Sequence, residues 1–296
     1  MPTLTVITPA FNAERFLAET IESVLNQDVP GLEYIIVDGG STDGTVDVIR
    51  KYEKKLAWWV SEKDRGQAHA VNKALARATG EFVAEADADD VYLPGALHTA
   101  LDMLRTTPGA RWVAGGVLGF GTADVPNHEW HMPDVPTSLL DCVTGKFQAA
   151  TPGHVWSREM LQSVGGYDES FRYLFDFELF ANLLAHGERC IPLDRPLAAY
   201  RFHPTSKTVA EIDHFEPEWD RIRERYVPRL PFYERIIARH RIAMRRSGAQ
   251  YTIAARELEA GHPADARSRF ARAIMSYPPS VLSRSGLGCA RRLVAR

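Results

Sequence analysis

The chain has 296 residues, of which 45% are hydrophobic and 25% charged, and its formal net charge is -3. That composition is typical of an ordinary globular protein with ample material for a core, and the charge neither favours nor excludes a nucleic-acid partner. No stretch approaches the ~20 apolar residues of a membrane span, and the first residues lack the basic and apolar regions of a secretory signal, so we expect a cytoplasmic protein. The three cysteines are widely spaced and form no CxxC pair, which favours buried reduced thiols at Cys142, Cys190 and Cys289.

The first third of the chain alternates strand-like and helix-like segments. Residues 14–27 place apolar side chains at helical spacing, and the Ala-rich segment 66–80 ends in Gly80, a residue suited to the position after a helix. This alternation predicts an α/β layer with a mainly parallel sheet flanked by helices. The pattern predicts strands at 3–8, 33–38, 56–62 and 81–87, and helices at 14–27, 44–52 and 66–80.

The rest of the chain is less regular at first and then helical. Residues 115–152 are rich in Gly, Pro, His and Trp and predict loops with one short strand at 111–118. A helix at 175–187 and a strand at 196–204 follow, and residues from about 212 onward look helical. We therefore expect one domain at 1–210, with halves 1–115 and 116–210, and a basic helical C-terminal extension at 211–296.

Polar residues follow each predicted strand of the first third. In open α/β sheets, ligands bind outside the carboxyl ends of the strands, and four polar segments lie there, at 8–12, 38–41, 64–67 and 87–90. In the last of them, Asp87, Asp89 and Asp90 repel one another unless a cation neutralises them. Either this is a solvated turn, or it holds Mg²⁺ or Mn²⁺, which suit carboxylate oxygens.

Six motifs in order resemble one family. TPAFN, VDGGSTDGT, GEFVAEADADD, VGGYDES, DFELF and YRFH follow the order of the family 2 glycosyltransferases, over residues 3–208. The sequence departs from the family pattern at two places. Gly39 stands where the family often has a second aspartate, and the segment DADD has one aspartate more than a DxD motif. The resemblance implies a GT-A fold with a Rossmann-like sheet. It also implies inverting, metal-dependent transfer from a nucleotide-diphospho-sugar, most simply UDP-linked, to a glycan or lipid-linked acceptor in cell-envelope glycan synthesis.

The resemblance also implies roles for single residues. Asp89 would ligate the metal, and His203 would complete the metal's coordination shell. Asp87 would lie against the ribose or the metal. Asp38 would accept a hydrogen bond from the nucleotide base. Asp176 would be the general base, and its apolar neighbours would raise its pKa. The alternatives are a turn-forming Asp38, a helix-start Asp176, and a core or surface His203.

Further candidates rest on weaker signals. Thr8, Pro9 and Phe11 would contact the nucleotide, or they form a plain connection in which Asn12 caps the next helix. Asp64 and Gln67 would contact the nucleotide, or Asp64 only matches the helix dipole. Two candidates for the acceptor are Trp156, which would stack on a sugar or lie in the core, and Glu178. A helical spacing of two points Glu178 away from Asp176, so at most one of them faces the chemistry.

Arginines accumulate towards the C-terminus while acidic residues become scarce. From about Arg221 the chain reads RIRERY, RIIARHRIAMRR and CARRLVAR. One interpretation is docking at an anionic membrane surface near a lipid-linked acceptor, and the other is a helical appendage with solvated or packed arginines. Nucleic-acid binding is disfavoured because no recognised module is present.

Two rival functions remain. A catalytically silent sugar-nucleotide or glycan-binding module would not need Asp38, Asp89 and Asp176 together. A nucleotidyltransferase would need metal and phosphates, but no Gly/Lys/Arg-rich phosphate loop follows the first strand. A dehydrogenase is excluded because the first turn reads TPAFNAE rather than GxGxxG.

Overall fold

The computed structural model describes residues 3–121, 130–132, 135–146, 151–207 and 214–294. Its chain divides into two compact units, Met1–Tyr226 and Val227–Arg296. The helix at 215–226, which the sequence pattern assigns to the C-terminal extension, belongs to the first unit.

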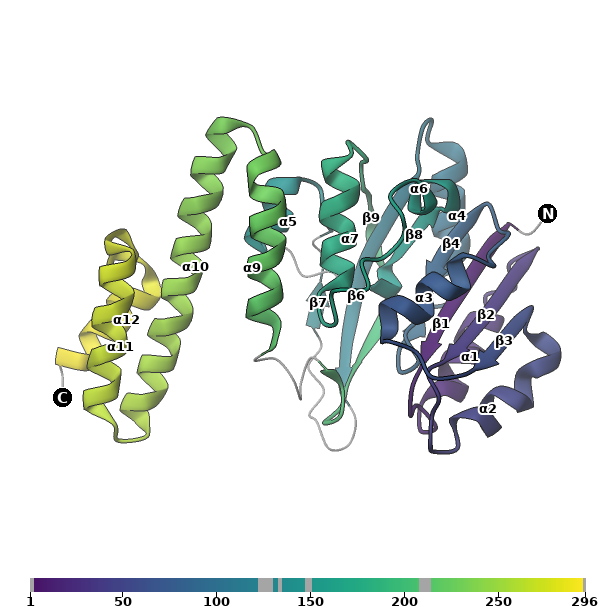
Figure 1. Cartoon of the computed structure of the whole chain (residues 1–296), viewed down its shortest axis with the longest axis horizontal. Helices are drawn as coiled ribbons and strands as arrows, with labels where there is room; N and C mark the ends of the chain where they lie inside the picture. Colours follow the sequence, from purple (N-terminus) through teal and green to yellow (C-terminus); the bar gives the residue numbers. More distant parts are fainter. Residues whose placement is uncertain (1–2, 122–129, 133–134, 147–150, 208–213, 295–296) are drawn as a thin grey trace. The chain divides into compact units, whose positions relative to one another are not determined.

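The strands of the described residues form one mixed sheet. Its order is β3-β2-β1-β4-β8-β6-β9-β5, with β7 paired to β6 at one side (Figure 1). The strands are β1 Leu4–Ala10, β2 Leu32–Asp38, β3 Trp58–Ser61, β4 Phe82–Glu85, β5 Val91–Tyr92, β6 Trp112–Gly121, β7 Trp130–Met132, β8 His154–Ser157 and β9 Ile191–Phe202.

Helices connect the strands of the first unit and make up most of the second. Those of the first unit are α1 Leu17–Leu25, α2 Thr45–Tyr52, α3 Gln67–Leu75, α4 Ala96–Thr106, α5 Leu139–Thr144, α6 Arg158–Ser163, α7 Phe175–Ala185 and α9 Phe215–Tyr226. Those of the second are α10 Phe232–Glu259, α11 Pro263–Ser276 and α12 Arg284–Val294. No helix among the described residues combines the length and the apolar character needed to cross a bilayer.

The N-terminal half of the sheet is parallel, as the alternation of strands and helices predicts. β3, β2, β1 and β4 run in the same direction, because each strand is followed by a crossover helix. β8 then runs antiparallel to β4 and β6, while β9 is parallel to β6 and antiparallel to β5. The carboxyl ends of β1 to β4 therefore share one edge, where the acidic segments follow.

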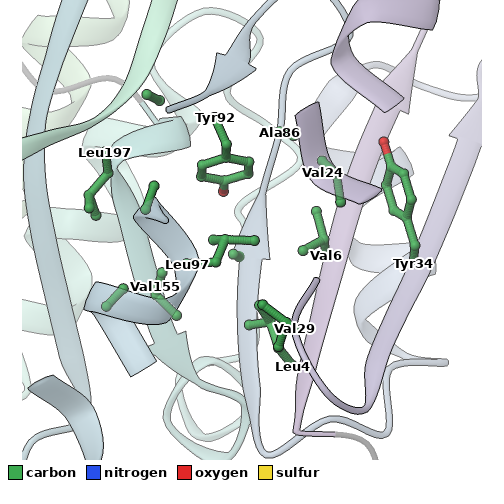
Figure 2. Packing of buried hydrophobic residues seen from close by; sticks show 14 of the residues in the cluster. Leu4, Val6, Val24, Val29, Tyr34, Ala86, Tyr92, Leu97, Val155 and Leu197 are labelled. Carbon is green, nitrogen blue, oxygen red and sulfur yellow. The ribbon is translucent and has the colours of Figure 1, made fainter. Parts of the chain in front are cut away.

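The core of the first unit lies between the sheet and its helices. Every residue of β1 is buried, as expected for a strand covered on both faces. In Figure 2 the side chains of Leu4 and Val6 on β1 gather with Val24 of α1, Leu97 of α4 and Leu197 of β9. All three cysteines are buried and free, which confirms the prediction of unpaired thiols.

The short strand predicted at 111–118 is confirmed as β6, which continues to Gly121 and pairs with β7, β8 and β9. The loop prediction for the rest of 115–152 is wrong in part, because β7 and α5 lie there. Gly115 is required by packing, because a Cβ there would lie 2.5 Å from the backbone oxygen of Arg195. Residues 122–129, also predicted as loop, lie outside the described residues.

Gly80 does not end a helix. α3 ends at Leu75, and the backbone of Gly80 instead lies against β1, where its N–H donates to Thr5 Oγ1 over 3.0 Å. A Cβ at residue 80 would meet Thr5 N and Oγ1 at 2.6 Å. We expect Gly80→Ala to lower the free energy of unfolding by about 1–3 kcal/mol, measured by urea denaturation.

The matched control for this substitution is Gly248→Ala. Gly248 lies within α10, and an added Cβ there would meet nothing within 4 Å, so alanine should stabilise that helix by about 0.5–1 kcal/mol. Equal destabilisation by both substitutions would show that the approach of residue 80 to β1 is not what requires glycine there.

Candidate active site

Acidic and amide side chains converge at the carboxyl edge of the parallel strands. Asp38 is the last residue of β2, Asp64 follows β3, and Asp87 and Asp89 follow β4. His203 comes directly after β9, and Asp176 lies at the start of α7. The site is thus built from the ends of separate elements that the fold brings together.

Asp89 and His203 form a direct contact. Asp89 Oδ2 lies 2.8 Å from His203 Nε2, although 114 residues separate them in the chain. On the other side of the ring, His203 Nδ1 lies 2.9 Å from Thr205 Oγ1, and the ring packs on Phe16 with centroids 4.9 Å apart. The histidine is 7% exposed, so its orientation is set by its surroundings.

This pair suits a divalent cation that also binds phosphate. Thr205 Oγ1 can accept the Nδ1 proton of His203, which leaves the Nε2 lone pair for a metal. Within the described residues no three His, Cys, Asp or Glu side chains are grouped so that they could hold a metal by themselves. Mg²⁺ sites with few protein ligands are completed by substrate phosphates and water, so two ligands from the chain fit a cation that arrives with a nucleotide.

The loop that carries Asp89 is held by Arg201. The Asp90 carboxylate is buried and accepts the backbone N–H of Arg201 over 2.8 Å, while Arg201 Nε donates to the backbone oxygen of Asp89 over 2.8 Å. The same guanidinium pairs with Glu19 at 2.6 Å and lies over the ring of Phe16. Asp90 is therefore a structural member of the DADD segment, and Arg201 is a positioning residue that sequence reasoning missed.

A lysine lies among the carboxylates. Lys207 Nζ donates to Gln67 Oε1 over 2.9 Å, and Gln67 Nε2 donates to Asp87 Oδ1 over 2.6 Å. The ammonium also lies 5.9 Å from the ring centroid of Phe175, next to Asp176 in sequence. Sequence reasoning missed Lys207, because no local pattern marks it.

Two carboxyl groups of the site titrate near neutrality. Burial raises the pKa of Asp176 to about 7, against hydrogen bonds from backbone N–H groups and the positive charge of Lys207. Burial and the neighbouring charge of Asp89 raise the pKa of Asp87 to about 7, and Lys207 again opposes the shift. Beneath them, burial and the charge of Asp87 also raise the pKa of Glu85, whose Oε2 accepts from the Tyr167 hydroxyl over 2.7 Å.

Asp176 and Glu178 point to different surroundings. Asp176 is half-buried, and its Oδ1 accepts the Phe177 N–H over 2.8 Å. Glu178 is 1% exposed and its Oε1 accepts from Arg225 over 2.7 Å and from Tyr226 over 2.5 Å. An acceptor cannot reach Glu178 in this arrangement, so we correct its assignment to the acceptor site: it ties α7 to α9.

Trp156 is also withdrawn from the acceptor site. The indole lies in β8, is 0% exposed, and stacks on His154 with ring centroids 5.5 Å apart. A sugar would need an open ring face, which this side chain does not present. The core alternative is the one that the structure supports.

Asp38 holds its own turn. Its Oδ2 accepts from the backbone N–H groups of Gly40 and Ser41 at 3.1 and 3.0 Å and from Ser61 Oγ at 2.6 Å. A Cβ at residue 39 would lie 2.6 Å from Asp64 Oδ2, so Gly39 makes room for that carboxylate. The resembled family often has a second aspartate at this position, whereas in this chain the Asp64 carboxylate lies against Gly39.

The residues after β1 differ in accessibility. Thr8 is buried and its hydroxyl lies 3.0 Å from the Tyr34 hydroxyl, Pro9 is also buried, and Phe11 is 65% exposed at the edge. The interpretation of Asn12 as a helix cap is wrong, because α1 begins after Phe16. With φ of 48°, Asn12 instead accepts the Thr42 N–H over 2.9 Å and joins the two loops.

Known proteins share this architecture. The structure resembles S. aureus TarS in complex with UDP-GlcNAc, with a TM-score of 0.63 and 19% identity over 81% of this chain and 70% of that one. It also resembles the mannosyltransferase PcManGT from Pyrobaculum calidifontis in complex with GDP-Man and Mn²⁺, with a TM-score of 0.59 and 19% identity over 99% of this chain and 85% of that one. The fold is therefore that of the GT-A glycosyltransferases.

The sequence comparisons point to one family of glycosyltransferases. Residues 5–145 match the model of "Glycosyl transferase family 2". A putative teichuronic acid biosynthesis glycosyltransferase, TuaG of Bacillus subtilis, is 42% identical over 106 residues, which are 35% of this chain and 42% of that protein. Residues 5–145 are therefore similar to glycosyl transferase family 2, and the match to TuaG spans about two fifths of the length of that curated relative.

Proposed function

We propose that this protein transfers a sugar from a UDP-linked donor to an acceptor hydroxyl with inversion, in the synthesis of a cell-envelope glycan. The observation that carries the proposal is the Asp89–His203 contact of 2.8 Å, in one site with the Asp87–Gln67–Lys207 chain. The name of the Bacillus relative supports the envelope glycan, and the UDP-GlcNAc complex of a protein with the same fold supports the donor class. A lipid-linked acceptor and peripheral membrane contact through the basic C-terminal residues are part of the proposal.

Asp176 is the proposed general base. A pKa of about 7 lets the carboxylate be deprotonated at physiological pH and still accept a proton from the acceptor hydroxyl as that oxygen attacks the anomeric carbon. Attack from the face opposite the departing nucleotide inverts the configuration at that carbon. The Phe177 N–H, which donates to Oδ1 over 2.8 Å, orients the base.

Asp89 and His203 are the proposed metal ligands. A bound Mn²⁺ or Mg²⁺ would neutralise the negative charge that develops on the leaving diphosphate. Arg201 holds the backbone of Asp89 in place, and Asp38, Asp64 and Phe11 at the edge of β1 to β3 are the proposed contacts of the base and ribose.

Lys207 is the proposed second cation for the diphosphate, because its ammonium already lies in the acidic site. We expect Lys207→Met to weaken UDP binding in Mn²⁺ about tenfold and to leave uridine binding unchanged, since uridine lacks the phosphates. Isothermal calorimetry with both ligands measures the difference. Lys73→Met is the control, because Lys73 pairs with Glu62 outside the site at 2.7 Å. An equal loss of affinity for uridine and for UDP would show that Lys207 does not contact the phosphates.

The function is tested with a panel of nucleotide sugars. Incubation of the protein with UDP-, GDP- and dTDP-sugars, with and without Mn²⁺, should give slow hydrolysis of a UDP-sugar in the presence of the cation. Tight binding of a donor without hydrolysis or transfer to any glycan would instead support the silent binding module. Preference for a GDP-sugar would overturn the assignment of a UDP-linked donor but would still support a glycosyltransferase.

A further inference from the structure

Positive charge is concentrated in the second unit. Residues 227–296 contain fourteen arginines, no lysine and four acidic residues, a formal charge of +10, so residues 1–226 carry -13 of the total of -3. Two of the four acids are already paired, Glu257 with Arg269 at 2.5 Å and Glu259 with Arg292 at 2.8 Å. Because arginines outnumber carboxylates in the unit by ten, it is suited to an anionic partner.

The same unit exposes several large apolar side chains. Four of them lie on the first two turns of α10, and two flank Tyr277, whose ring lies 5.6 Å from that of His240 on the following turn of α10. We name this set the apolar patch: Phe232 (75% exposed), Tyr233 (62%), Ile236 (54%), Ile237 (37%), Met275 (74%) and Leu282 (74%). The unit has its own buried core around Tyr251 and Leu258, so these side chains are additional to it.

Arginines border the apolar side of α10. At 3.6 residues per turn, Phe232, Ile236, Tyr233 and Ile237 cover a sector of about 140°. Arg239 and Arg246, both exposed, lie along one edge of that sector, and Arg241 lies along the other. An apolar sector with a cationic border is the pattern of a helix that lies in a membrane interface.

We propose that the second unit docks on an anionic phospholipid surface, with the apolar patch inserted at the headgroup level and the arginines on lipid phosphates. A guanidinium group can donate two parallel hydrogen bonds to the oxygens of one phosphate. Aromatic residues such as Tyr233 are suited to the membrane–water interface. A second copy of the unit fits less well, because it would oppose +10 with +10. A nucleic acid would leave Phe232 and Ile236 without an apolar environment. This inference rests on the membrane contact included in the proposed function and specifies its surface, but vesicle binding is measured without sugar transfer, so either can fail while the other holds.

The test is co-sedimentation of the full chain with vesicles. We expect binding to phosphatidylcholine vesicles that contain roughly a third phosphatidylglycerol, and at least ~10-fold weaker partitioning to pure phosphatidylcholine or at high salt. Phe232→Ser with Ile236→Ser should lower partitioning to the anionic vesicles about tenfold or more. Leu287→Ser is the matched control, because Leu287 is exposed (43%) on α12 outside the patch and should bind like the unchanged protein.

Circular dichroism of each variant shows whether α10 is retained. Equal binding to neutral and anionic vesicles, or no binding to either, would overturn the proposal. Unchanged binding of the Phe232→Ser/Ile236→Ser variant would also overturn it. A dimer in solution that this variant dissociates, without vesicle binding, would assign the patch to a second copy, and preferential binding of RNA over vesicles would assign the arginines to nucleic acid.

Discussion

Asp176→Asn is expected to lower turnover by at least ~100-fold while UDP affinity stays within a few-fold of the unchanged protein. A general base contributes typically ~10²- to 10⁴-fold to rate, and the asparagine keeps the size of the side chain without its basicity. The proposed nucleotide contacts, Asp38 and the Asp89–His203 pair, are left in place. Turnover is measured with a saturating donor, and UDP binding by calorimetry.

The pH dependence of the reaction follows from the same residue. Because burial raises the pKa of Asp176 to about 7, turnover of the unchanged protein should fall about tenfold per pH unit below pH 7, as the base becomes protonated. Stability should change in the opposite direction. A carboxyl group whose pKa is raised on folding binds more protons in the folded state, so it destabilises the fold as pH rises from about 4 to 7. Asp176→Asn should therefore be at least as stable as the unchanged protein at pH 8.

Glu178→Gln is the internal control for the base. Glu178 bonds to Arg225 and Tyr226 in the core, so its replacement should lower the melting temperature and keep most of the turnover of the folded protein. If Glu178→Gln proves more damaging to turnover than Asp176→Asn, the base is misassigned by two positions. If both variants keep near-normal turnover, α7 does not carry the chemistry.

Asp89→Asn is expected to damage binding and turnover together. It removes a proposed ligand of the cation that links the protein to the diphosphate, so UDP affinity in Mn²⁺ should fall at least ~10-fold, with a parallel loss of turnover. His203→Asn should act in the same direction. In EDTA, both variants should bind UDP as weakly as the unchanged protein does, because no cation is present to be lost.

The control for the metal ligands is Asp102→Asn, an exposed aspartate on α4 away from the site, which should leave Mn²⁺-dependent binding intact. Equal UDP affinity of the unchanged protein in Mn²⁺ and in EDTA would contradict the metal assignment altogether. Binding that stays dependent on Mn²⁺ in Asp89→Asn would shift the ligand to a neighbouring carboxylate, with Asp87 as the next candidate.

Local sequence patterns were sufficient for the parallel half of the sheet and for the position of the site. The period of the apolar residues separates strands 3–8, 33–38 and 81–87 from the helices between them, and parallel connectivity then forces their carboxyl ends to one edge. Asp38, Asp64 and Asp87 had to lie near that edge wherever the rest of the chain folded. The order of the family motifs added the roles expected of Asp89, Asp176 and His203.

Only the tertiary structure decided which side chains meet and which are buried. The contacts of Asp89 with His203, Gln67 with Lys207 and Glu19 with Arg201 join residues 114, 140 and 182 positions apart, and no local period reports such distances. From the sequence, Trp156 and Glu178 could equally contact a ligand or lie in the core, because the residue type alone does not distinguish a binding site from a buried position. Their burial depends on the packing of β4 and β6 on β8 and of α9 on α7. Glycine is likewise required at residues 80 and 115 because backbone that is distant in the sequence passes close to them. This backbone is β1 for Gly80 and the segment at Arg195 for Gly115.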